Sequence, residues 1–381
     1  MKISKEQAKI FALFFVVFMP EICTQIKPLF YFFSLCAIWI FARYIYSFVR
    51  NKTLPSHILL WLLSCSYLLI IMILNGNISD IDKWGKMTIY VSDLMLLLDY
   101  YCKKGKTKDL LSAVTMLGVI MLSINVVSFI IFPSGLIHTL GGDYYFLGTR
   151  NHLLKYFFAF LSASGLQYIY CKKKKGLILT VLLSISQFIY FQISTAITCA
   201  VLLLGLFLLK DVLKNKLNMK LVLIITTILS VLFVFFDAAN FFSWFIINIL
   251  HKDVGLNSRS LIWAEAIRII FSDKAKLFLG NGIYNNGNFI SLYGLDWPAH
   301  NQLLEWLFEY GIVGTGLLYL FYSKLDNHIK WGKDYFLIIA SCFTIFVASI
   351  SSGPLSGAPG YMALCLLPHL NSFRKDTSYR V

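Results

Sequence analysis

The sequence predicts an all-α polytopic membrane protein, with about twelve transmembrane helices and one large periplasmic or extracellular loop that carries short helices. Of the 381 residues, 58% are apolar and only 14% are charged, whereas soluble domains carry about 25% charged residues. Apolar runs long enough, or nearly long enough, to cross a bilayer follow one another along the chain. These runs are 10–23, 28–46, 57–74, 84–101, 110–132, 152–170, 177–192, 195–209, 221–236, 302–323, 335–351 and 355–370.

The basic residues predict the topology. If the N-terminus is cytoplasmic, every second gap between runs is also cytoplasmic, and basic residues should gather in those gaps. They hold 24 of the 34 basic residues: Lys2, Lys5, Lys9, Arg43, Arg50, Lys52, Lys103, Lys104, Lys106, Lys108, 172–175, Lys210, Lys214, Lys216, Lys220, Lys324, Lys330, Lys333, Arg374, Lys375 and Arg380. We therefore expect a multi-pass protein with both termini in the cytoplasm, and the net charge of +15 requires no nucleic-acid partner.

The chain is expected to form one transmembrane helical domain over 1–381. The first run is followed by no small-x-small cleavage site, so it is interpreted as an anchor rather than a signal peptide. Gaps on the outer side are short except 133–151 and 237–300, and 237–300 is the large outer loop. The eight cysteines include no C-x-x-C motif and no outer-gap pair, so neither a disulfide framework nor a zinc site is predicted.

The outer loop contains its own predicted helix, in "LNSRSLIWAEAIRIIF". Asn257 or Ser258 is the expected N-cap, and apolar residues from Ile262 onward recur with the helical period, so the helix should lie on the membrane surface or against the bundle. Arg259 would lie at the helix N-terminus, which favours anions, unless it caps the helix or pairs with Glu265. Arg268 would lie on roughly the opposite face of the same helix. It would either bind an anion there or be an arginine at the membrane interface whose charged end reaches water.

A second unusual segment is "PAHNQLLEWLFEYGIVG", at 298–314. The next helix is expected to start near His300, so that Asn301, Glu305 and Glu309 form a polar stripe at i, i+4 and i+8. Lipid exposure of such a stripe is costly, so it should line a cavity open to the outside, with His300 at the mouth. Glycines at 311 and 314 would let a neighbouring helix approach. The alternative is that these residues are structural.

These segments resemble the membrane O-antigen ligase and polymerase superfamily. In that family an Arg-x-x-x-Trp helix, a Gly-x-Gly turn and a His-Asn…Glu…Gly-x-x-Gly helix occur in this order, as do "NSRSLIWAEA", "LFLGNGIYN" and "AHNQLLEWLFEYGIVG" here. The resemblance is specific over about 257–316 and extends more weakly to "LGTRNHLLKYFFAF" and "QISTAI". Twelve spans with one large outer loop near the C-terminus also fit the family.

The resemblance implies inverting, metal-independent and cofactor-free glycosyl transfer on the outer face of the bacterial cytoplasmic membrane. His300 would activate the acceptor hydroxyl, and Asn301 and Glu305 would orient the His300 ring by hydrogen bonding. Arg259 would hold the diphosphate of an undecaprenyl-diphosphate-linked glycan. Where family members often carry Ser-Arg, this chain has Ser194-Thr195-Ala196. The candidates for the missing second arginine are Arg150, in the other long outer gap, and Arg268.

Three functions remain open at this point. The first is a polymerase that joins repeat units of an O-antigen or capsular polysaccharide, with a chain-length regulator protein as a candidate partner. The second is a ligase that transfers finished polysaccharide to lipid A core, which shares the same motifs. The third is a transporter or flippase, which predicts internal repeats and broken helices; the sequence shows no repeats and one Gly/Pro-broken segment at 353–360.

Overall fold

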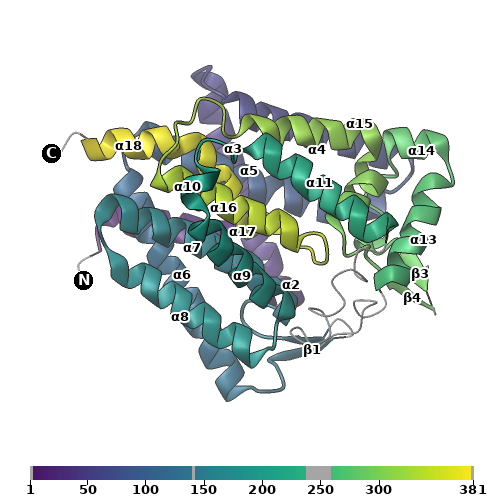
Figure 1. The fold of residues 1–381 in the computed structure, drawn as a ribbon, viewed down its shortest axis with the longest axis horizontal. Coiled ribbons are helices and arrows are strands. Elements are labelled where there is room, and N and C mark those ends of the chain that lie inside the picture. Colours follow the sequence, from purple (N-terminus) through teal and green to yellow (C-terminus); the bar gives the residue numbers. More distant parts are fainter. Residues whose placement is uncertain (1–2, 140–141, 237–258, 293, 379–381) are drawn as a thin grey trace.

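The computed structural model describes residues 3–139, 142–236, 259–292 and 294–378, and helices dominate them (Figure 1). The helices are α1 (Lys5–Val17), α2 (Ile22–Gln25), α3 (Lys27–Arg50), α4 (Ser56–Leu74), α5 (Ile81–Lys103), α6 (Thr107–Ile131), α7 (Leu153–Cys171), α8 (Lys174–Tyr190), α9 (Ser194–Leu208), α10 (Lys210–Leu213), α11 (Met219–Phe235), α13 (Arg259–Phe271), α14 (Lys274–Leu279), α15 (Gln302–Lys324), α16 (Lys333–Ala348), α17 (Gly357–Leu366) and α18 (Leu370–Ser378). Short 3₁₀ turns are η1 (Ile78–Asp80), η2 (Arg150–His152), η3 (Asn285–Gly287) and η4 (Leu367–His369).

The described part of the chain has two short antiparallel hairpins, neither predicted from the sequence. Strand β1 (Ile137–Thr139) pairs with β2 (Gly142–Tyr144), and β3 (Ile290–Leu292) pairs with β4 (Leu295–Trp297). Each strand is three residues long, which is too short for alternation of apolar and polar residues to give a clear signal.

Every predicted apolar run contains a helix, and the all-α class is confirmed. Four helices within the described residues are long and apolar enough to cross a membrane: α3, α4, α6 and α15. Helices α9 and α11 are apolar but shorter. The protein is therefore a helical membrane protein.

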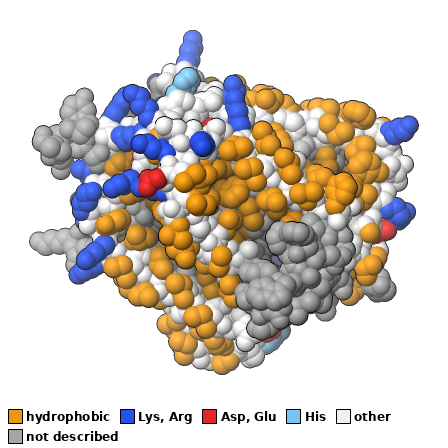
Figure 2. Space-filling view, in the orientation of Figure 1, with side chains coloured by type: hydrophobic (Ala, Val, Ile, Leu, Met, Phe, Trp, Pro, Cys, Tyr) orange, Lys and Arg blue, Asp and Glu red, His pale blue; other side chains and the backbone are white. Residues whose placement is uncertain are grey.

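The two ends of the bundle differ in composition. Figure 1 shows both termini at one end, here called the terminus end, and α13, β3 and β4 at the other, here called the loop end. Lys and Arg side chains gather toward the terminus end, and apolar side chains cover the middle (Figure 2). Contacts there join segments that are distant in sequence: Arg374 pairs with Asp334, and the Thr107 hydroxyl donates to Asp376. All four residues come from predicted cytoplasmic gaps or their borders.

The loop helix α13 packs against the bundle rather than lying apart on a membrane surface. Its buried residues include Ile262 and Trp263, which join a small apolar cluster with Leu304 and Phe308 of α15. The Trp263 indole N–H donates to the Ala299 carbonyl over 3.0 Å. The helix spans 259–271, as its apolar period predicts, while the expected caps at 257 and 258 lie outside the described residues.

Helix α15 begins at Gln302, two residues after the predicted start, because Asn301 is its N-cap. The Asn301 side-chain oxygen accepts hydrogen bonds from the backbone N–H groups of Leu303 and Leu304. The helix is interrupted at Gly311, whose φ of 63° and ψ of −173° are not helical. The prediction that Gly311 and Gly314 let neighbouring helices approach is confirmed, because a Cβ on Gly311 would meet Phe278 and Leu279 of α14 and one on Gly314 would meet Tyr67 of α4. The break at Gly311 was not predicted, since a continuous helix was expected there.

A turn from the large loop occupies the break. The N–H groups of Asn281 and Gly282 donate to the carbonyls of Phe308 and Glu309 over 2.8 and 2.9 Å. A Cβ on Gly311 would collide with the backbone at 278–280, so only glycine allows this approach. The chain just after α4 holds the turn from the other side, since Asn75 and Asn77 donate to the carbonyls of Gly280 and Asn281.

Candidate functional site

A charged cavity of about 330 Å³ lies where helix ends from five parts of the chain meet. We call it the polar cavity. Its charged and titratable lining residues are Glu21, Lys83, Lys86, His152, Lys155, Glu305 and Glu309. Glu21 follows α1, and the two lysines at 83 and 86 lie in the first turns of α5. His152 and Lys155 lie at the start of α7, and the two glutamates at 305 and 309 lie in the first turns of α15. Residues 353–359 complete the wall. All these segments belong to predicted outer gaps or to the helix turns next to them.

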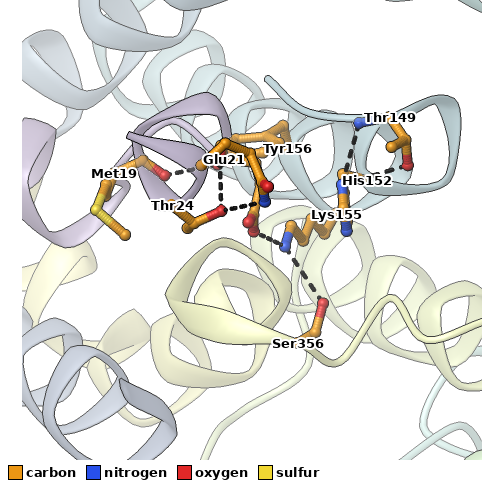
Figure 3. Close-up of polar contacts among 9 residues, drawn as sticks. Met19, Glu21, Thr24, Thr149, His152, Lys155, Tyr156 and Ser356 are labelled. Atoms are coloured by element: carbon orange, nitrogen blue, oxygen red, sulfur yellow. Dashed lines mark hydrogen bonds and ion pairs between the residues drawn. The ribbon is translucent and has the colours of Figure 1, made fainter. Parts of the chain in front are cut away.

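One wall is built around a buried ion pair between Lys155 and Glu21 (Figure 3). The Lys155 side chain is 3% exposed and its ammonium group also donates to the Ser356 hydroxyl over 3.3 Å. The neighbouring Tyr156 hydroxyl donates to the Met19 carbonyl, which fixes the chain just before Glu21. The Lys155 ammonium group, which is far from water, requires the Glu21 carboxylate, because an unpaired buried charge is costly.

His152 lies beside this pair in a defined tautomer. The backbone N–H of Thr149 donates to its Nδ1 over 3.2 Å, as Figure 3 shows. Nδ1 therefore carries no proton, and the neutral ring bears its proton on Nε2. Because His152 lines the cavity, this N–H is a donor available for an oxygen atom of a bound ligand.

The opposite wall comes from the first turns of α15. Glu309 forms an ion pair with Lys83 of α5 over 3.4 Å, and Glu305 is next to Gln302, whose amide donates to it over 3.4 Å. The predicted stripe of Glu305 and Glu309 therefore faces a polar cavity, as its spacing indicates, and the break at Gly311 comes only after both acids. Together the walls carry three lysines and three glutamates, which suits a ligand with both anionic and hydroxyl groups.

His300 and Arg259 form a second group next to the cavity. Trp263 lies one helical turn after Arg259 and is bonded to Ala299, so the helix presents Arg259 toward His300. Burial and the positive charge of Arg259 lower the pKa of His300 to about 4, and burial lowers the pKa of Arg259. The His300 ring is therefore neutral at pH 7. Its backbone N–H donates to Glu305, which connects this pair with the cavity.

Asn301 has a different environment from the one expected of a residue that orients His300. Its side chain is fully buried, and besides capping α15 it donates to Ser230 of α11 over 2.9 Å and to the Ile350 carbonyl over 3.0 Å. These contacts tie three helices together at the loop end. The structure thus favours the structural alternative for Asn301.

The other two candidate arginines are not brought to His300. Arg268 forms a two-bond pair with Glu265 on the same helix, and its side chain is 71% exposed, which matches the alternative that it is an interfacial residue. Arg150 is exposed in η2, two residues before His152, and does not line the polar cavity. Of the three arginines, the structure places only Arg259 beside His300.

Sequence reasoning missed Glu21, His152, Lys155, Lys83 and Lys86. A signal was present, because Lys155 interrupts the apolar run 152–170 and ionisable residues inside membrane helices usually mark a functional site. Lys83 and Lys86 also stand on the side that the charge pattern otherwise leaves poor in basic residues.

Replacing Arg259 by lysine is expected to remove most activity while leaving the protein level unchanged. Lysine keeps the charge but loses the planar fork with which an arginine can bind the diphosphate that the resemblance implies. The measurement is polymer on a gel beside a membrane-fraction blot, with Arg268→Lys as the control because that side chain is exposed and already paired. Normal polymer from the Arg259→Lys protein would show that the arginine is merely structural.

Within the described residues, no three side chains of His, Cys, Asp or Glu lie close enough together to hold a metal ion. Fold and site together define the protein as a helical membrane protein with a charged cavity at one end of its bundle. Comparisons of the chain with protein-family models, with curated proteins and with solved structures give no match.

Proposed function

We propose that the protein is a membrane glycosyltransferase of the bacterial cytoplasmic membrane, a polymerase that joins undecaprenyl-diphosphate-linked repeat units of an O-antigen or capsular polysaccharide. The observation that carries the proposal is the polar cavity beside a neutral histidine and a half-buried arginine. A glycosyl donor of this type needs cations for its diphosphate and a base for the acceptor hydroxyl, and both kinds of group meet at the start of α15.

In the proposed reaction the acceptor hydroxyl oxygen attacks the anomeric carbon of the donor sugar from the face opposite the diphosphate. The new C–O bond forms as the bond to the diphosphate oxygen breaks, and the diphosphate leaves with the electron pair. The hydroxyl proton passes to His300, a transfer worth about 10²–10⁴ in rate. Arg259 and the cavity lysines stabilise the charge that develops on the leaving group.

The lowered pKa of His300 bears on this role. A base with a pKa of about 4 accepts a proton weakly. A diphosphate bound near Arg259 would offset the positive charge that helps to lower the pKa, and would raise it toward the working pH. Substrate binding would thus strengthen the base at the moment it is needed.

The proposal includes an orientation, with the loop end on the outer face and both termini in the cytoplasm. It is supported by the basic residues that gather toward the terminus end (Figure 2). In a variant without native cysteines, a cysteine at Asn286 should react with a membrane-impermeant thiol reagent in cells stripped of outer barriers, whereas one at Lys173 should not. Reversed labelling would place the cavity on the wrong side for this chemistry.

Two alternatives keep an observation in their favour. A ligase that transfers polysaccharide to lipid A core would use the same cavity and the same histidine. A transporter is favoured by the break in α15 at Gly311, because transporter sites are often built at broken helices.

The deciding experiment reconstitutes the purified protein in proteoliposomes with lipid-linked repeat units and follows products on a gel. A ladder of polymers is expected with repeat units alone. Transfer only when lipid A core is added would identify a ligase. Movement of the lipid-linked glycan across the bilayer without a new glycosidic bond would identify a transporter and overturn the proposal.

A further inference from the structure

A narrow apolar groove of about 200 Å³ lies between α3 and α5, next to the polar cavity. One wall is made by Phe30, Ser34 and Ile38, which recur every four residues and therefore lie along one face of α3 over about 12 Å. Gly85 and Ile89 make the facing wall on α5, with Asp82 at its start. We call this the α3/α5 groove.

The groove exists because two small residues lie in its walls, Ser34 on α3 and Gly85 on α5. A Cβ placed on Gly85 would meet no atom within 4 Å, so the space beside it is open. The outward side of α3 is apolar, with Leu35 68% and Trp39 53% exposed, and α3 is one of the helices apolar enough to cross a membrane. The groove therefore opens where the hydrocarbon of a bilayer would lie.

The groove is continuous with the polar cavity, because Lys86 and Tyr90 line both. The Lys86 ammonium lies over the Phe30 ring, 4.4 Å from its centre. A positive charge that can reach a phosphate thus stands directly at the end of an apolar channel. This arrangement matches the two parts of an anionic lipid, a charged head and a hydrocarbon chain.

We propose that the α3/α5 groove holds the hydrocarbon chain of a polyprenyl diphosphate whose diphosphate occupies the polar cavity. The inference rests on the proposed function for the identity of the lipid and adds where its chain enters and lies. A single narrow groove suits a lipid with one chain, whereas a bilayer phospholipid carries two. Lys86 is the residue that separates head from chain.

The test uses Gly85→Phe, which fills the groove and leaves all three cavity lysines in the chain. Binding of a long-chain polyprenyl diphosphate to the purified protein in detergent is expected to weaken at least tenfold, while binding of inorganic diphosphate stays unchanged. Gly205→Phe is the matched control, since Gly205 on α9 also has nothing within 4 Å of its Cβ position. That variant should bind both probes as the native protein does.

Unchanged binding of polyprenyl diphosphate to Gly85→Phe would overturn the inference. So would equal competition by phosphatidylglycerol, which would mean that the groove takes any bilayer lipid. If Gly85→Phe does not fold, the native protein with a polyprenyl diphosphate carrying a photoreactive chain replaces it, and labelling outside residues 30–38 and 85–90 overturns the assignment. If the protein binds polyprenyl diphosphate through the groove but forms no glycosidic bond, the lipid site is supported and the glycosyltransferase function is contradicted.

Discussion

Replacing Lys155 by methionine is expected to destabilise the protein by about 1–3 kcal/mol. The substitution keeps the length of the side chain but leaves the Glu21 carboxylate without its buried partner. The loss is smaller than for a fully buried pair, because the Glu21 side chain is 22% exposed and lines the polar cavity. The measurement is the thermal unfolding midpoint of the purified protein in detergent.

The double variant Glu21→Gln with Lys155→Met separates stability from function. It removes both charges, so it should regain most of the lost stability and still form no polymer, because the cavity has lost a cation. Lys86→Met is the control for stability only: it also removes a cavity cation, but it leaves the Glu21–Lys155 pair intact and should keep the native unfolding midpoint. A single Lys155→Met protein with a native unfolding midpoint would contradict the ion-pair account.

Replacing His300 by alanine is expected to abolish polymer, a loss of about 10²–10⁴ in rate if the ring is the base. The protein should remain inserted and folded, because His300 is only partly buried and its backbone N–H, which bonds Glu305, is retained. The residue has a φ of 50°, which alanine tolerates less well, so a moderate loss of stability is expected as well. Polymer banding and a membrane-fraction blot measure the two effects.

Two further variants near the start of α15 distinguish a catalytic role from a structural one. Glu305→Gln should be milder than His300→Ala, because an amide oxygen still accepts the His300 N–H. Asn301→Ala should lower the unfolding midpoint, since it removes the cap of α15 and the bonds to Ser230 and Ile350. Normal-length polymer from the His300→Ala protein would return the histidine to a structural role.

Hydropathy and helical period were sufficient to predict most of the fold. The apolar runs each contain a helix, and the period of α13 gave its position closely. The break in α15 was not predictable, because Gly311 fits a packed helix as well as a broken one, and only the contact with 278–280 decides between them. Helix α14 has six residues, too few for a periodic signal.

The candidate site was predicted only in part, for a physical reason. Motif spacing brought out His300, Glu305 and Arg259 because they lie close together along the chain or in one resemblance. The polar cavity also needs Glu21 and Lys155, which are 134 residues apart and meet only through the packing of α7 against the chain after α1. Pairings of this kind leave no local pattern in a single sequence.

Because of the turn at 279–282, the segment that contains α14 and the helix α15 cannot be exchanged separately between related proteins. Backbone groups of Asn281 and Gly282 complete the hydrogen bonding of α15, so a transplanted loop must bring a turn of the same length and glycine placement to the same register. Recombination that cuts between residues 282 and 311 would leave open carbonyls inside the bundle. The smallest unit that can be exchanged intact is therefore the whole stretch from α14 through the break in α15.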